Sequence, residues 1–175
     1  MRSFALSLAF MCLALTATAQ TVTSDLNGDG LAERFTLIAH DGQADLRIET
    51  TGHEPIIAHR IAWSGGIGQK PTLALAPNGS VLLTSMNEAI GRNRWHLTLT
   101  IAFRQNGYRV VGYTYDWHDT LNLEDSGLCD LNLLTGKGTL RKGEGGSMPI
   151  HTNMRAILVS DFRDDHKIPE ACGLD

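Results

Sequence analysis

The sequence is poor in charged residues, proline and cysteine. Charged residues make up 19% of the 175 residues, and the chain has only 5 prolines and 3 cysteines. The 15 Lys and Arg against 19 Asp and Glu give a net charge of −4, so the chain lacks the basic excess of a nucleic-acid-binding surface. With 18 glycines and 42% hydrophobic residues, this composition excludes a disordered chain or a coiled coil and favours one loop-rich globular domain.

Long apolar runs are absent after residue 19. Before that point, the single charge of Arg2 precedes the apolar segment Phe4–Leu15, and an Ala-x-Ala pattern ends at Ala19. This pattern is typical of a secretory signal peptide cleaved after Ala19, which competes with a membrane anchor or a core helix. The apolar segment is too short to span a bilayer of about 30 Å as a helix. We therefore predict a signal peptide at 1–19, a single all-β domain at 20–175, no transmembrane segment in the mature chain, and a periplasmic or secreted location.

Only two cysteines remain in the mature chain. Cys12 lies in the predicted signal peptide, which leaves Cys129 and Cys172. An exported chain enters an oxidising environment, and two cysteines allow only one pairing. We predict a Cys129–Cys172 disulfide that closes a loop of about 44 residues and adds about 3–4 kcal/mol of stability on the chain-entropy model. The alternative is a pair of buried free thiols; a catalytic thiol is disfavoured because no local motif for one is present.

A helical pattern is also absent, because no helix start coincides with an apolar period of 3.6 residues after the signal. Instead, large apolar residues alternate with smaller or polar residues from Trp95 to Phe103. This period of two is typical of a strand with one buried face. A second strand is expected from Tyr108 to about Trp117, so the two segments should form a hairpin.

Two turns fit between these strands. A two-residue loop pairs Gln105 with Tyr108, whereas a three-residue loop with Gly107 in the left-handed conformation pairs Arg104 with Tyr108. A register shift of one residue moves every partner to the other face. Only the three-residue loop sets the large apolar residues opposite one another: Ile101 and Val111, Leu99 and Tyr113, Leu97 and Tyr115, Trp95 and Trp117. We therefore predict the three-residue loop.

Further strands and turns recur along the chain. A second three-residue loop, 77–79, is expected to pair Leu75 with Val81 and Leu73 with Leu83. Other predicted strands are Arg34–His40, Ala44–Glu49, Ile56–Trp63, Arg155–Phe162 and Leu121–Leu134, the last broken at Ser126-Gly127. Turns are expected at Asp41-Gly42, Thr51-Gly52 and Thr135-Gly136. This pattern predicts an all-β fold, an antiparallel β-sandwich or barrel-like meander with an N-terminal calcium loop.

The acidic segment 24–33 carries the sharpest chemical pattern. Side-chain oxygens recur at positions 1, 3, 5 and 9 of a calcium loop, a glycine occupies position 6, and a backbone carbonyl serves at position 7. The predicted calcium ligands are Asp25, Asn27, Asp29, Leu31 through its carbonyl, and Glu33. Three carboxylates offset the charge of a divalent cation, and glycines let the backbone curl around it. We predict a structural calcium ion; the alternative is a turn rich in Asp and Asn without a metal.

This loop is not an EF-hand. Thr36 stands at position 12, where an EF-hand requires Glu, and Arg34–His40 is predicted as a strand instead of a helix. The spacing instead resembles the Asp-x-Asn-x-Asp-Gly-x-x-Asp/Glu calcium loops of extracellular β repeats of the integrin and VCBS type. Such loops usually tie a terminus to a sheet, which is the role we expect here.

Candidate catalytic groups are weaker. The run Asp116–Asp119 contains two carboxylates and a histidine, but the seven histidines of the chain are scattered without zinc spacing. Glu124, Asp125 and Asp130 could supply a carboxylate pair for glycoside cleavage, although their separation does not follow from the sequence. The sequence has no nucleophile elbow and no phosphate-binding loop. We therefore predict that the protein is not an enzyme.

Four segments resemble a family of small exported bacterial proteins over about residues 25–140. They are Leu73–Leu83, Trp95–Gly107, Val111–Asp116 and Asn132–Lys137. The family shares a calcium-loop start, a Gly-Tyr-Asp-Tyr-like strand and an Asn-x-Leu-Thr-Gly-Lys hairpin. One branch comprises periplasmic immunity proteins that block a peptidoglycan-cleaving, lysozyme-like effector and resemble periplasmic lysozyme inhibitors. Such inhibitors often insert a Ser-Gly-x-x-Tyr loop, but Ser64–Ile67 and Ser126–Cys129 lack the tyrosine, so no inhibitory residue is carried over.

The resemblance implies a non-enzymatic periplasmic calcium-binding protein that binds another protein, with a cell-wall hydrolase as the expected partner. The glycine-rich segment Ser64–Lys70 is the loop that we expect to protrude for this purpose. The alternative function is a structural or adhesion-type module of the envelope. An enzyme that uses Asp116, His118 or nearby carboxylates is the third hypothesis.

Overall fold

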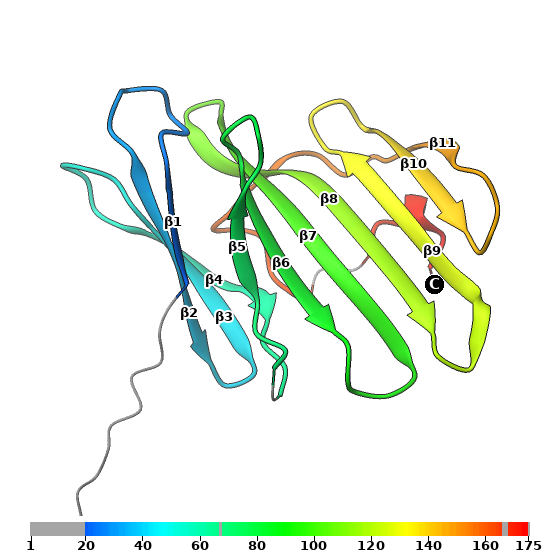
Figure 1. The fold of residues 1–175 in the computed structure, drawn as a ribbon. Helices are drawn as coiled ribbons and strands as arrows, with labels where there is room; N and C mark the ends of the chain where they lie inside the picture. Colours follow the sequence, from blue (N-terminus) through cyan, green and yellow to red (C-terminus); the bar gives the residue numbers. More distant parts are fainter. Residues whose placement is uncertain (1–19, 67, 166–167, 175) are drawn as a thin grey trace, which may run out of the picture.

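A computed structural model describes residues 20–66, 68–165 and 168–174 (Figure 1). The predicted signal peptide at 1–19 lies outside the described residues. Strands dominate the described part, and its one helical element is a single 3-10 turn, η1 (Glu170–Cys172). In this part of the chain, no helix is long and apolar enough to cross a membrane. The all-β prediction is therefore confirmed.

The strands form two antiparallel sheets, consistent with the β-sandwich prediction (Figure 1). The smaller sheet has the order β1 (Thr21–Ser24), β2 (Glu33–His40), β3 (Gln43–Glu49) and β4 (Ile56–Trp63). The larger sheet has the order β11 (Met148–His151), β10 (Lys137–Lys142), β9 (Asn122–Asn132), β8 (Gly107–Asp119), β7 (Asn93–Arg104), β6 (Val81–Asn87) and β5 (Thr72–Leu75), and β12 (Ile157–Leu158) pairs with β8. The edges of the smaller sheet meet the larger one where β1 lies near β5 and β4 near β6.

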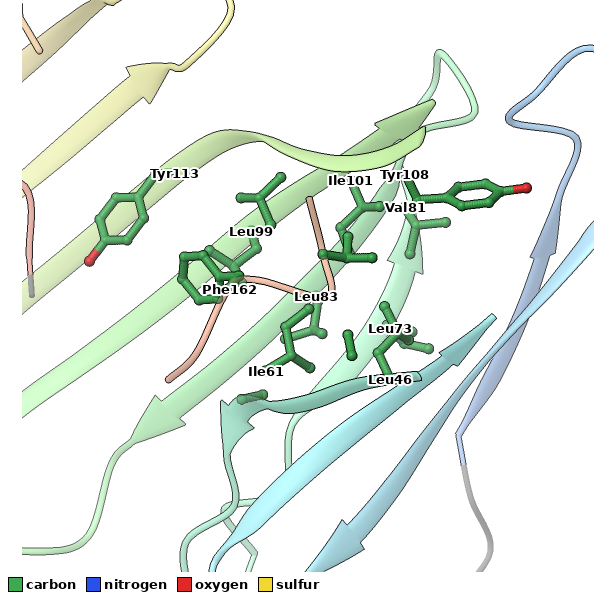
Figure 2. Close-up of a cluster of buried hydrophobic side chains, with 14 of the residues drawn as sticks. Leu46, Ile61, Leu73, Val81, Leu83, Leu99, Ile101, Tyr108, Tyr113 and Phe162 are labelled. Carbon is green, nitrogen blue, oxygen red and sulfur yellow. The ribbon is translucent and has the colours of Figure 1, made fainter. Parts of the chain in front are cut away.

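The hydrophobic core lies between the two sheets (Figure 2). The smaller sheet contributes Leu46 and Ile61, and the larger sheet contributes Leu83 and Leu99; none of the four has measurable solvent exposure. Phe162, from the segment after β12, inserts between the sheets and is 1% exposed. Burial of each such side chain stabilises the fold by about 1.5–3 kcal/mol, so these contacts hold the two sheets together.

The turn of the β7–β8 hairpin differs from the predicted one. Arg104 pairs with Gly107, which leaves a two-residue loop of Gln105 and Asn106. Both loop residues have positive φ, 51° and 57°. Such a conformation is typical of a type I′ turn, whose twist matches that of the flanking strands. The predicted three-residue loop with a left-handed Gly107 is therefore wrong.

A β-bulge restores most of the predicted pairs further along this hairpin. The register shifts between Thr100 and Ile101, so Ile101 lies opposite Val110 and not opposite Val111. Beyond the bulge, Leu99 lies opposite Tyr113, as predicted, and the pairs Leu97–Tyr115 and Trp95–Trp117 are also correct. The extra residue in β8 compensates for the shorter turn, and the large apolar side chains stay on the buried face.

The other hairpins agree more closely with the sequence pattern. In β5–β6, Leu75 pairs with Val81 and Leu73 with Leu83, which confirms the predicted register. The strand predicted at Ile56–Trp63 has these bounds in the structure, and β2 and β3 each begin one residue earlier than predicted. The sequence pattern did not single out β1, β10 and β11 as strands, because these short segments carry little apolar alternation.

Two strand predictions are wrong in detail. The expected break at Ser126-Gly127 does not occur, because β9 continues through it and Gly127 pairs with Trp117. A Cβ at Gly127 would lie 2.3 Å from the Trp117 ring, so this glycine makes room for an aromatic side chain instead of ending the strand. The strand predicted at Arg155–Phe162 shortens to the two residues of β12, after which the chain turns into the core.

A disulfide joins the C-terminal segment to the larger sheet. Cys129 of β9 and Cys172 of η1 are bonded, with their Cα atoms 5.5 Å apart and a sequence separation of 43. Both cysteines are fully buried. The predicted pairing therefore fits the structure, and it holds the last described residues against β9.

Candidate functional site

The acidic loop connects β1 to β2 and curls back on itself. Gly28 and Gly30 adopt φ values of 76° and 87°, which residues with a side chain rarely adopt. The curl directs two backbone amides at Asp25. Its Oδ1 accepts a hydrogen bond from the Gly28 N–H at 2.8 Å, and its Oδ2 accepts one from the Gly30 N–H at 3.0 Å. Asp25 therefore fixes the shape of the loop.

Asn27 and Asp29 continue this local network. Asn27 Oδ1 accepts a hydrogen bond from the Asp29 N–H at 2.8 Å, and Asn27 Nδ2 donates to Asp29 Oδ2 at 2.9 Å. Asp29 Oδ1 accepts a hydrogen bond from the N–H of the exposed Leu31 at 2.8 Å. Three of the four side chains predicted as calcium ligands therefore share one loop and stay near the surface.

Glu33 has a different environment, because its side chain is fully buried at the start of β2. Its Oε2 accepts a hydrogen bond from the Leu26 N–H at 2.7 Å, and its Oε1 accepts one from the Tyr108 hydroxyl at 2.7 Å. Burial raises the pKa of Tyr108 to about 12; the hydrogen bond with Thr50 opposes this effect, and the Glu33 carboxylate adds to it. Glu33 thus links the acidic loop to the larger sheet.

The loop suits a hard divalent cation in part. Asp25, Asn27 and Asp29 offer the oxygen donors that calcium prefers, in a backbone curled by glycine. Both oxygens of Glu33 are occupied by hydrogen bonds within the protein. Among residues 20–66, 68–165 and 168–174, no three His, Cys, Asp or Glu side chains are grouped so that they could hold a metal ion. The calcium site therefore stays a prediction.

A second candidate lies where β8 turns into β9. Leu121 and Leu123 are the most exposed large hydrophobic residues of the described chain, at 79% and 73%. Leu123 and Glu124 line a hollow of about 350 Å³ together with Glu144, from the connection after β10. We call these four residues the hairpin-end surface. It combines apolar side chains with carboxylates at one end of the larger sheet.

A third candidate is a groove at the same end of β7 and β8. Its aromatic wall consists of Trp95, Tyr115 and Trp117, and the C-terminal residues Ile168 and Leu174 face this wall across a cavity of about 270 Å³. Its polar lining residues are Asn93, Arg94, His118, Asp119 and Asp125. We call this site the aromatic groove. It was not predicted, because its wall combines residues from two strands and the C-terminal segment.

The run Asp116–Asp119 does not form the acid–base cluster considered from the sequence. Successive side chains of a strand point to opposite faces, so the run is divided between them. Asp116 Oδ1 lies 3.0 Å from His96 Nδ1, whereas the buried Asp119 accepts a hydrogen bond from Arg92 Nε at 2.7 Å. The Arg92 guanidinium lowers the pKa of Asp119 through this hydrogen bond.

The three carboxylates considered for glycoside cleavage lie at different places along β9. Glu124 and Asp125 are exposed near the hairpin end. Asp130 lies further along the strand, where its Oδ1 accepts a hydrogen bond from the Thr114 hydroxyl at 2.8 Å. Asp130 therefore lies apart from Glu124 and Asp125 along β9.

One charged cluster has no counterpart in the sequence pattern. Asp45 of β3 lies between two histidines, with Oδ1 2.7 Å from His40 Nε2 and Oδ2 2.9 Å from His59 Nδ1. A β-bulge in β4, where Arg60 has a φ of 52°, also directs the Arg60 N–H at Asp45 Oδ1. Burial opposes ionisation, but these hydrogen bonds outweigh it and lower the pKa of Asp45 to about 2. Nothing in the sequence signals the bulge that assembles the cluster.

The segment expected to protrude, Ser64–Lys70, is tied to the body of the protein by the Ser64 N–H, which donates to the Gly42 carbonyl, and by Gln69. Gln69 is 4% exposed, and its Oε1 accepts hydrogen bonds from the N–H groups of Glu88 and Ala89. The Gln69 carbonyl also accepts a hydrogen bond from the Gly65 N–H, and the Gln69 N–H donates one to the Gly66 carbonyl. Residue 67 lies outside the described residues. The segment therefore has a buried anchor, and the most exposed apolar side chains lie elsewhere, at the hairpin-end surface.

Comparisons of this chain with protein-family models, with curated proteins and with solved structures give no match. The resemblance to exported calcium-loop proteins stays an expectation from the sequence motifs.

Proposed function

We propose that this chain is an exported, non-enzymatic calcium-binding protein of the cell envelope that binds another protein through the hairpin-end surface. The observation that carries this proposal is the exposure of Leu121 and Leu123, at 79% and 73%. Large apolar side chains that lie exposed together are typical of interaction sites. A partner that covers both would gain the free energy of burying two leucines.

The charges around the leucines favour a basic partner. Glu124, Asp125 and Glu144 are exposed, whereas Arg92 at the same end is engaged by Asp119. Carboxylates around an apolar contact attract and orient a partner of opposite charge. An enzyme that cleaves the anionic cell wall benefits from a basic surface for the same reason. We therefore propose a peptidoglycan-cleaving, lysozyme-like enzyme as the partner, in line with the family that the sequence resembles.

In this proposal, calcium has a structural role. Asp25, Asn27, Asp29 and the Leu31 carbonyl would hold the ion, and Glu33 would support the loop from the core. Bound calcium would neutralise the carboxylates of the loop and fix the connection between β1 and β2.

Inhibition of a muramidase tests the proposed function. The mature chain is added to a lysozyme-type muramidase that acts on a peptidoglycan suspension, and its retention on the immobilised enzyme is measured in parallel. We expect inhibition by the wild type and its loss in the double variant Leu121→Ser, Leu123→Ser. Leu134→Ser serves as the matched control, because Leu134 is 48% exposed beyond the opposite end of β9 and should leave inhibition unchanged.

The alternative function has a distinct outcome in the same assay. If the wild type leaves the muramidase fully active and is not retained on it, the inhibitor proposal fails. Binding to intact envelope fragments without inhibition would then favour the structural or adhesion-type module.

A further inference from the structure

A row of aromatic side chains runs out of the core into the aromatic groove. Tyr113 of β8 is 2% exposed, inside the core. The next two residues on the same face of β8, Tyr115 and Trp117, are only partly buried, as is Trp95 on the neighbouring strand. Tyr115 and Trp117 pack against the core with only part of their surface. Their partial exposure leaves apolar ring surface available to a ligand.

The rings of the groove are nearly parallel. The centroids of Trp95 and Tyr115 are 6.2 Å apart with an interplanar angle of 26°, and those of Tyr115 and Trp117 are 5.8 Å apart at 24°. This arrangement forms one continuous aromatic wall across two strands. The C–H groups on the face of a sugar ring pack on such a wall by dispersion, and they are attracted to the negative face of the π system.

The opposite wall limits the size of the ligand. Ile168 and Leu174 face the rings across a cavity of about 270 Å³. Pockets for drug-sized ligands run from about 300 to 1,000 Å³, so this cavity suits a ligand portion about the size of one sugar ring. The buried disulfide at Cys172, two residues before Leu174, keeps this wall attached to the sheet.

The polar lining distinguishes between classes of ligand. Asn93 and Asp125 lie on the same face as the rings, because each is two residues from Trp95 or from Gly127, the partner of Trp117. The Asn93 amide can donate or accept hydrogen bonds, and the Asp125 carboxylate accepts them. A site for a simple anion would contain hydrogen-bond donors and no carboxylate. A site for a lipid chain would contain no polar groups. A sugar hydroxyl both donates and accepts, so a mixed lining beside aromatic rings matches a saccharide.

We propose that the aromatic groove is a saccharide-binding site. One sugar ring packs against the wall formed by Trp95, Tyr115 and Trp117, and its hydroxyls bond to Asn93 and Asp125. This proposal does not rest on the protein partner proposed above, because its central residues lie outside the hairpin-end surface.

Isothermal titration calorimetry of the mature chain tests the proposal. The probes are two soluble tetrasaccharides, one of β-1,4-linked N-acetylglucosamine and one of β-1,4-linked glucose. We expect saturable binding of at least one probe with a dissociation constant of about 1 mM or lower. Trp95→Ala should weaken this binding about tenfold or more, as expected for the loss of one stacking contact.

Two further variants separate stacking from general damage to the fold. Trp63 contacts Trp95, with ring centroids 5.4 Å apart, but does not line the groove, so Trp63→Ala should change the affinity less than about twofold. Asp125 is exposed, so Asp125→Ala leaves the core intact and should weaken binding at least about threefold.

Three results would overturn the proposal. The first is no binding of either tetrasaccharide at about 10 mM ligand. The second is an equal loss of affinity in Trp63→Ala and Trp95→Ala. This would mean that binding depends on the packing of the aromatic side chains in general and not on direct contact with Trp95. The third is a roughly tenfold loss of affinity when salt is raised, which would indicate a charged ligand in place of a neutral saccharide.

Discussion

At the scale of single residues, Asp45 makes the stability of the protein sensitive to acid. Its pKa is about 2 in the folded chain, below the ordinary value of 3.8. Because the pKa is lower in the folded state, the stabilisation that the Asp45 carboxylate contributes is complete above about pH 4. It is lost as the pH falls toward 2. For a side chain that is 14% exposed, this shift corresponds to about 2 kcal/mol.

Urea unfolding between pH 5 and about 2 measures this effect. In Asp45→Asn, we expect lower stability near neutral pH and a flatter dependence across the acidic range. Asp41→Asn is the matched control, because Asp41 is an exposed turn residue of the same hairpin. Parallel pH curves for the wild type and Asp45→Asn would contradict the prediction.

Glu33 is the second residue whose contribution can be measured. Glu33→Gln keeps one oxygen but presents an NH2 group to a hydrogen-bond donor, either the Tyr108 hydroxyl or the Leu26 N–H. We expect a loss of about 1–3 kcal/mol in the free energy of unfolding, as for a buried polar group without its partner. A double-mutant cycle with Tyr108→Phe should show non-additive losses. Additive losses would mean that the Glu33–Tyr108 contact contributes little.

At the scale of elements, the absence of a side chain at Gly127 allows the β9 backbone to lie close to the Trp117 ring. A Cβ at this position would lie 2.3 Å from that ring and 2.6 Å from the Arg141 carbonyl oxygen. We expect Gly127→Ala to lower the free energy of unfolding by about 1–3 kcal/mol, because side chains and backbone must shift to admit the methyl group. Gly146→Ala, with open space around it, should leave thermal unfolding unchanged. Equal melting temperatures in both variants would show that β9 adapts without cost.

The acidic loop is the element at which the metal prediction can be tested. We expect calcium to raise the melting temperature of the mature chain, and Asp29→Ala to abolish that rise. An ion that binds only the folded loop stabilises it by about 2.7 kcal/mol at a hundredfold excess over its dissociation constant. Glu54→Ala removes an exposed carboxylate elsewhere and should respond to calcium like the wild type. If Asp29→Ala responds equally, the ion does not bind at this loop.

The hairpins indicate how far the sequence pattern predicts this fold. Alternation of apolar residues predicted β7 and β8 and the pairing of Leu99 with Tyr113, because the buried face requires that register. It did not predict the turn, because Gln105 and Asn106 adopt positive φ without glycine. It also did not predict the bulge, whose only effect in the sequence is one additional residue.

The candidate sites also consist of parts that the local sequence predicts and parts that depend on the tertiary fold. The acidic loop is local in sequence, so its spacing identified Asp25, Asn27 and Asp29 as neighbours. The burial of Glu33 depends on Tyr108, which lies 75 residues away. The aromatic groove depends on the pairing of β7 with β8 and on the C-terminal segment. Contacts of this kind follow from the tertiary fold, and local spacing does not contain them.

At the scale of the whole molecule, the disulfide holds the C-terminal segment on the larger sheet. The bond spans 43 residues, so its removal should lower the free energy of unfolding by about 3–4 kcal/mol. We expect the same loss for Cys172→Ser and for the wild type under reducing conditions, measured by urea unfolding. A reductant should have no further effect on Cys172→Ser. Unchanged stability of the reduced wild type would mean that the bond adds nothing to the packing around it.

The larger sheet ends at β11, a strand of four residues that contains Pro149. A free strand edge can recruit another chain through its unpaired N–H and C=O groups. Proline has no N–H to donate, and a four-residue strand offers few groups in total. At the opposite end, β1 lies near β5 and shields that edge. The arrangement of these two edges should therefore protect the sandwich against aggregation by strand addition.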